Sequence, residues 1–168
     1  MTKGQMMDIG KAMLEEFADE TALTRSLLNV VPDDLLSFQA GETMHTVQWN
    51  VSHLADIPSW MEVILKANEF DVAPPGEPPH DTVLLGSASE ALSVFDKNVA
   101  GAVACIESLD VETLEQPWTL KAGGHPLMTM TRFAAFRKYQ LNHVAHHRGH
   151  LLVYLRLNGI ETPLLYGG

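Results

Sequence analysis

The chain has very little cysteine, and this excludes one class of structure. Cys105 is the only cysteine among 168 residues, so no disulfide can form within the chain and a small secreted fold held by disulfides is excluded. Such cysteine usage is typical of the reducing cytoplasm, where we expect the protein to be. A chain of this length can bury a core without cross-links, and we expect one domain spanning residues 1–168.

Basic residues and long hydrophobic runs are also scarce. Lys and Arg number 11 against 21 Asp and Glu, which gives a formal net charge of −10, and a negative field repels phosphate backbones and anionic lipid surfaces. No stretch approaches the roughly 20 apolar residues that a membrane-spanning helix needs. We therefore expect no nucleic acid and no membrane as partner. The composition, 46% apolar and 19% charged, is that of an ordinary globular domain.

Apolar residues recur every three or four positions in four stretches, which predicts four helices. The expected ranges are residues 5–30, 43–67, 87–109 and 130–157. Pro58 should kink the second helix by removing a backbone hydrogen bond. Ser87 or Ser89 can cap the third, and the Asn158–Gly159 pair is a usual stop for the fourth.

The segments between these helices complete the predicted fold. Residues 70–81 carry four prolines and a glycine and should form a long loop. Residues 116–130 contain a Gly-Gly pair flanked by short apolar runs, which is typical of a small hairpin or an ordered loop. The expected fold is therefore all-α, a four-helix bundle with a long inner connection and a short hairpin before the last helix.

Four of the eight histidines fall within the segment NHVAHHRGH, residues 142–150. His143 and His147 lie four residues apart, so on a helix they project from one face about one turn apart and can share a metal ion. His146 and His150 form a competing pair with the same spacing. We favour His143 and His147, because their helix face continues into apolar and amphipathic residues and should point into the bundle.

Two histidines alone would hold a metal ion weakly, so a third ligand should come from another helix. His53, between Trp49 and Trp60 in the second predicted helix, is the best candidate. Asp56 either accepts a hydrogen bond that supports the site or is a solvated helix charge. Position 144 is Val144, so the H-E-x-x-H pattern of metalloproteases, with its glutamate base, is absent and peptidase activity is disfavoured.

Three segments in this order resemble the DinB/YfiT-like metalloprotein family: MHTVQWNVSHLADIPSW, WTLKAGG and HVAHHRGHLLVYLRLNGIETPLLYG. The resemblance covers essentially the whole chain. It implies an up-and-down-type four-helix bundle, commonly a homodimer, with a divalent metal held by one histidine of the second helix and two of the fourth. In this chain those residues are His53, His143 and His147.

The chain departs from the family motif at one position. The family usually reads HHRGQ where this chain reads HHRGH, so His150 takes the place of a glutamine. Unlike glutamine, histidine can carry a proton near neutral pH or bind a metal. His150 is therefore a candidate proton carrier, an occasional fourth ligand, or a polar replacement. His146 and Arg148 match the motif, and we expect them to be structural.

Three neutral imidazoles leave the full charge of a divalent ion available for Lewis-acid chemistry. Zinc is the first expectation, with nickel, iron or manganese as alternatives. The family includes metal-dependent transferases that activate a low-molecular-weight thiol, such as bacillithiol or mycothiol, and suspected hydrolases. The resemblance thus implies a thiol S-transferase that acts on an electrophilic small molecule. The alternatives are a hydrolase that uses metal-bound hydroxide and a non-catalytic stress-response metal-binding protein.

Other residues have simpler expected roles. Cys105 lies on the apolar stripe of the third helix and should be a core residue. The three tryptophans either line a pocket or pack in the core. His45, His80 and His125 lie in or near loops or a helix start, where exposure to solvent is the simplest expectation. Tyr166 could bring the C-terminal tail over the site.

Overall fold

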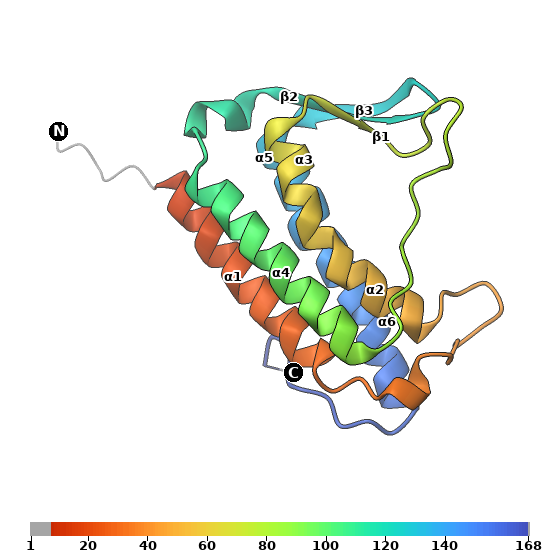
Figure 1. Ribbon diagram of the computed structural model, residues 1–168. Helices are drawn as coiled ribbons and strands as arrows, with labels where there is room; N and C mark the ends of the chain where they lie inside the picture. The colour runs from red at the N-terminus through yellow and green to blue at the C-terminus, as the bar shows by residue number, and fades with distance from the viewer. Residues whose placement is uncertain (1–7, 168) are drawn as a thin grey trace.

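The computed structural model describes residues 8–167 and shows four long helices with a small sheet at one end (Figure 1). The elements are α1 Ile9–Leu28, η1 Asp33–Leu35, α2 Val47–Asp56, η2 Ile57–Ser59, α3 Trp60–Lys66, β1 Glu69–Asp71, α4 Ala88–Glu107, η3 Val111–Glu115, β2 Pro117–Ala122, β3 His125–Thr131, α5 Arg132–Ala135, η4 Phe136–Asn142 and α6 His143–Leu157. Within the described part of the chain, no helix is both long and apolar enough to span a bilayer.

The four predicted helices are confirmed, with defined ends. The Asp8 carboxylate accepts a hydrogen bond from the Lys11 N–H and starts α1; residues 5–7 of the predicted first helix lie outside the described range. The second predicted helix is broken at Pro58 into α2, η2 and α3, as expected. Ser87 caps α4, and α6 ends at Leu157, just before Asn158 and a glycine with positive φ.

The long inner connection sets the arrangement of the bundle. Helix α4 contacts α1 and α2, and α6 contacts the same two helices, so α1 and α2 occupy opposite corners. In Figure 1, α2 and α4 run in the same direction, because residues 68–86 carry the chain back along the bundle before α4 begins. The helices therefore depart from the strict alternation of an up-and-down bundle.

The predicted hairpin is confirmed as β2 and β3, which pair antiparallel around Gly123 and Gly124. Both glycines have positive φ, a conformation that glycine adopts without steric cost. The structure adds a third strand that was not predicted, because β1 pairs parallel to β2 with Glu69 opposite Thr119. A strand of three residues is too short for its periodicity to be read.

Two clusters of buried apolar side chains fill the bundle. One includes Leu54 of α2 and Leu151 of α6, and the other includes Met61 of α3 and Phe136 of η4, nearer the sheet. Side chains buried to this degree each stabilise the fold by roughly 1.5–3 kcal/mol. Trp60 and Val99 pack against both clusters, and the rings of His53 and His143 lie next to Trp60.

Candidate metal centre

Three histidines from two helices converge on one point. His53 on α2 and His143 on α6 have their Nε2 atoms 3.0 Å apart, and one nitrogen from each of His53, His143 and His147 lies within 4.8 Å of the others. Nitrogens bound to one ion at about 2.0–2.1 Å would be separated by similar distances. The structure thus brings together the three side chains that the sequence indicates.

Burial keeps these rings uncharged at neutral pH. Desolvation, reinforced by neighbouring histidines, lowers the pKa of His53 to about 4 and the pKa of His147 to about 3. Burial, and then His146, also lower the pKa of His143. A neutral imidazole has one nitrogen with a free lone pair, so the three rings are in the protonation state that binds a cation.

Contacts around His53 fix the direction of its ring. The Nδ1 atom of His53 lies 2.8 Å from Thr82 Oγ1. If Nδ1–H donates to this hydroxyl, Nε2 is left as the acceptor that faces His143, which is the usual way in which a neighbouring group orients a metal-binding histidine. Trp49 stacks on the other side of the His53 ring, with centroids 4.4 Å apart.

Asp56 holds a tryptophan in place. Its Oδ2 atom accepts a hydrogen bond of 2.9 Å from Trp60 Nε1, and its Oδ1 atom accepts one from Ser59. The Trp60 ring lies 5.4 Å from the His53 ring and 5.5 Å from the His143 ring. Of the two roles left open for Asp56, the structure is closer to the first, because the carboxylate accepts hydrogen bonds from Trp60, which lies beside the histidine rings, and from Ser59.

Both backbone segments that carry the histidines are irregular near the site. Helix α2 passes into η2, and α6 begins directly after η4, a π-helix. Gln140 of η4 donates a hydrogen bond of 2.9 Å to the Ile57 carbonyl of η2 and ties the two segments together. A π-helix widens the turn and changes which residues share a face, so it sets the direction of Tyr139 relative to His143.

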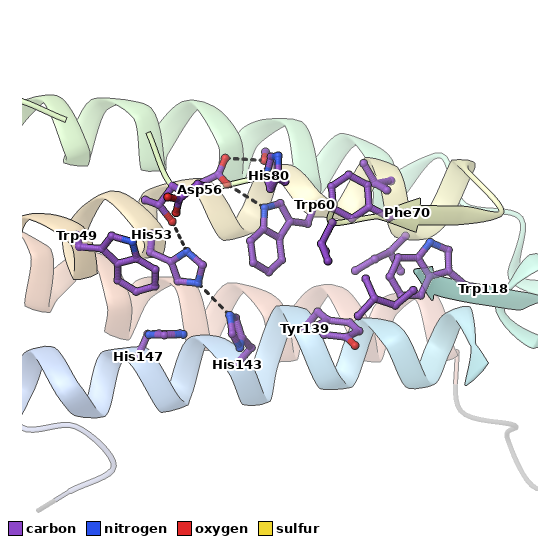
Figure 2. A pocket seen from close by; sticks show the side chains of 17 residues that line it. Trp49, His53, Asp56, Trp60, Phe70, His80, Trp118, Tyr139, His143 and His147 are labelled. Carbon is purple, nitrogen blue, oxygen red and sulfur yellow. Dashed lines mark hydrogen bonds between the residues drawn. The ribbon is translucent and has the colours of Figure 1, made fainter. Parts of the chain in front are cut away.

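The histidines form one end of a pocket of about 450 Å³ (Figure 2). Most of its wall is aromatic or aliphatic, and among the described residues no lysine or arginine lines it. The lining residues are Trp49, His53, Asp56, Ser59, Trp60, Val63, Ile64, Phe70, Val72, His80, Asp81, Thr82, Trp118, Leu120, Tyr139, His143 and His147. All three tryptophans therefore line the pocket.

The sequence alone did not indicate that several residues line the pocket. Phe70 comes from the unpredicted strand β1 and Tyr139 from the unpredicted π-helix. His80 was expected only to be exposed; it also lines the pocket, where its ring lies 5.3 Å from that of Phe70. The Gly and Pro spacing indicates a loop at residues 70–81, but not that the loop covers the site.

The residues present fit a divalent cation. Nδ1 of His147 is buried and has no hydrogen-bond partner among the described residues, and an unsatisfied buried polar atom costs roughly 1–3 kcal/mol. The Nε2 atoms of His53 and His143 are at hydrogen-bond distance, so in the metal-free chain one ring donates to the other. If His143 moves that proton to its Nδ1, both Nε2 lone pairs become available, and a cation would bind them together with the nitrogen of His147.

The tail does not cover this site, contrary to expectation. The Tyr166 hydroxyl contacts Arg148 and donates to the Glu20 carboxylate, and Tyr166 does not line the pocket. Arg148 is 1% exposed and also donates to Thr24 Oγ1 at 2.9 Å. These contacts join α1, α6 and the tail, in agreement with the structural role expected for Arg148.

The model of the DinB superfamily matches residues 16–151. The chain belongs to the DinB superfamily. No curated protein matches it. Solved structures similar to this DinB-superfamily member share 17–22% of its sequence. At this level of identity, the similarity shows a common fold and nothing about function.

Three of these structures come from Bacillus species. A DinB-like protein from Bacillus cereus ATCC 10987 is 22% identical, with a TM-score of 0.69 over 93% of this chain and 97% of that one. The DinB-like protein YjoA of Bacillus subtilis is 20% identical, with a TM-score of 0.66 over 91% and 96%. YfiT of Bacillus subtilis, described as a "probable metal-dependent hydrolase with an unusual four-helix bundle topology", is 17% identical, with a TM-score of 0.68 over 96% and 94%.

Proposed function

We propose that this DinB-superfamily protein is a metal-dependent enzyme that transfers a low-molecular-weight thiol to an uncharged, largely apolar electrophile. The observation that carries the proposal is the position of three uncharged imidazoles at the end of an apolar pocket. Drug-sized ligands occupy pockets of about 300–1,000 Å³ with mostly apolar walls and a few polar groups, and this pocket falls within that range.

His53, His143 and His147 would hold the ion, and zinc is our first choice, with nickel, iron or manganese as alternatives. When bound, a divalent ion supplies positive charge that stabilises the anionic form of a thiol or of water. Thr82 would keep the Nε2 atom of His53 directed at the ion, since it contacts Nδ1. Trp49 would limit rotation of the same ring by stacking on it.

The wall of the pocket supports an uncharged, largely apolar substrate. Phe70, Trp118 and Tyr139 present aromatic surface to the pocket, and apolar contact with them would exclude water from the bound electrophile. Because no lysine or arginine among the described residues lines the pocket, the only positive partner for a phosphate or carboxylate group would be the ion, and in this proposal the thiol occupies the ion. We therefore expect an uncharged substrate.

A thiol needs less help than water to lose its proton in this pocket. A thiol has a pKa of about 8.5, whereas the pKa of water is about 15.7, so a thiol can lose its proton with less assistance. Asp56 and Thr82, two of the few polar side chains in the wall, already make hydrogen bonds within the protein. Hydrolysis is the second candidate, favoured by the description of the structural relative YfiT.

Turnover measurements distinguish the candidates. Tag-free protein loaded with zinc or nickel would be mixed with a panel of uncharged aromatic electrophiles and esters, with and without cysteine, bacillithiol or mycothiol. Loss of the electrophile only with a thiol supports transfer, and turnover with water alone supports hydrolysis. Bound metal without either activity would support the third candidate, a non-catalytic stress-response metal-binding protein.

Metal content tests the ligand assignment separately. Elemental analysis would compare the unaltered chain with His53→Ala and His147→Ala, and with His125→Ala as the control because His125 is exposed on β3. We expect stoichiometric metal in the unaltered chain and the control, and strong depletion in the two site variants. Stoichiometric metal in both site variants would reject the assignment.

The remaining expectations stay predictions. We propose a homodimer, as the resemblance implies, and sedimentation at several concentrations would detect it. The cytoplasmic location, the single domain and the proton-carrier role of His150 also stay predictions.

A further inference from the structure

A second group of histidines lies next to the first. One nitrogen from each of His146, His147 and His150 lies within 4.8 Å of the others. The His146 and His150 rings are 4.3 Å apart between centroids, and the His147 ring is 4.9 Å from His146 and 5.8 Å from His150. We call this set the outer group, and His53, His143 and His147 the inner group.

The two groups differ in access to solvent. His146 is exposed and His150 is half-buried, and neither lines the pocket. In the inner group, His53 and His147 are buried and all three rings face the apolar pocket. A cation that enters through the pocket passes mostly apolar walls that offer it few ligands, whereas at the exposed His146 it can exchange water for imidazole directly.

His147 belongs to both groups and connects them. An ion that moves from the outer to the inner group has to exchange two of its three ligands, because His147 is common to both sets. The third member of the outer group is His150. Without His150 the outer group would have two imidazoles, which is too few for a firmly held ion.

We propose that His146, His147 and His150 form a solvent-facing divalent-cation site that loads the inner group. The inference rests on the proposed metal-dependent function, because it assumes that the inner group holds an ion. The loading site and the substrate pocket reach His147 from different sides, since His146 and His150 do not line the pocket. The ion can therefore enter without crossing the space that the electrophile occupies.

Equilibrium binding tests whether the outer site exists. Tag-free full-length protein, stripped with a chelator, would be titrated with Ni²⁺ by calorimetry after the inner group is disabled by His53→Ala and His143→Ala together. We expect this double variant to retain one weaker Ni²⁺ site. Adding His150→Gln should weaken that site by more than the roughly tenfold that loss of a supporting hydrogen bond costs.

A matched control and a folding check accompany this titration. His125→Gln in the same double-variant background should leave the weaker site unchanged, because His125 is an exposed histidine of β3 outside both groups. Circular dichroism would verify that each variant keeps its helices. A folded double variant that binds no Ni²⁺, or that binds equally with and without His150→Gln, would overturn the outer site.

Association kinetics test the loading role. Trp49 and Trp60 lie 4.4 Å and 5.5 Å from inner-group rings, so their fluorescence should report Ni²⁺ arrival in a stopped-flow experiment. In the otherwise unaltered chain, His150→Gln should slow this arrival by about tenfold or more while the final occupancy stays the same. Equal rates would overturn the loading role.

The results also separate this inference from the function on which it rests. If the unaltered chain binds no Ni²⁺, both the proposed function and the outer site fail. If His53→Ala abolishes tight binding but His150→Gln changes neither the rate nor the weaker site, the outer site fails and the inner site stands.

Discussion

Acidification should destabilise the metal-free protein through two buried histidines. In the folded chain the pKa of His53 is lowered to about 4 and that of His147 to about 3, in both cases chiefly by desolvation, whereas an unfolded histidine titrates near 6.5. Below pH 6.5 these two histidines are therefore protonated in the unfolded chain but stay neutral in the folded chain. The stability that these rings confer is fully present above pH 6.5 and is lost as the pH falls toward 4 and 3.

The size of the effect follows from the same values. A pH of 5 lies about 1.5 units below the pKa of an unfolded histidine. At 1.36 kcal/mol per unit, the free energy of unfolding should fall by about 2 kcal/mol for each ring. Because the rings line a pocket that is open to solvent, we reduce this to about 1–2 kcal/mol each. A total of about 2–4 kcal/mol is large beside the 5–15 kcal/mol that stabilises a typical domain.

Urea unfolding at pH 7 and pH 5, followed by circular dichroism in the presence of a chelator, measures this loss. His147→Gln removes one of the two groups with the largest shifts and should reduce the pH dependence by up to about half, because the lowered pKa of His143 also contributes. His125→Gln removes an exposed histidine and should leave it unchanged. Equal stability of the unaltered chain at the two pH values, or the same pH dependence in His147→Gln, would refute the reasoning.

Three further substitutions test residues other than the histidines. Thr82→Val removes the hydroxyl that contacts His53 and should weaken Ni²⁺ binding by about 10–100-fold in calorimetry, with little change in stability; unchanged affinity would mean that Thr82 does not orient the ring. Arg148→Leu leaves Glu20 and Thr24 without a buried partner and should lower the free energy of unfolding in urea by about 3 kcal/mol, while Tyr166→Phe should lower it by about 1 kcal/mol. Equal effects of these two changes would contradict the central place given to Arg148.

The helices and the pair of candidate ligands on α6 could be predicted because their signals are local. His143 and His147 are four residues apart, and this spacing alone places them on one helix face. His53 was harder, since no local pattern shows which helix lies opposite α6. Its place between two tryptophans and the resemblance to a family with one histidine in the second helix both favoured it, and the contact between α2 and α6 explains how it comes to lie beside His143.

The pocket could not be predicted to the same extent, because its wall depends on long-range pairing. Phe70 reaches the pocket from β1, and β1 exists only because it pairs with β2, with residue 69 opposite residue 119. Tyr139 depends on a π-helix, for which the sequence between residues 136 and 142 gives no readable signal. The prediction that Tyr166 covers the site was wrong for a related reason. Tyr166 binds the buried Arg148 instead, and that contact depends on long-range packing.

The π-helix immediately before His143 makes the pocket wall sensitive to chain length as well as to residue identity. A π-helix turns the chain less per residue than an α-helix does, so the seven residues of η4 turn it about as far as six α-helical residues would. Removing one residue and closing the segment as an α-helix would therefore keep Phe136 in the core and the histidines directed at His53, but it would change the direction of Tyr139. During divergence, the loss of a single codon in this short segment could thus reshape the pocket wall while the three histidines kept their places.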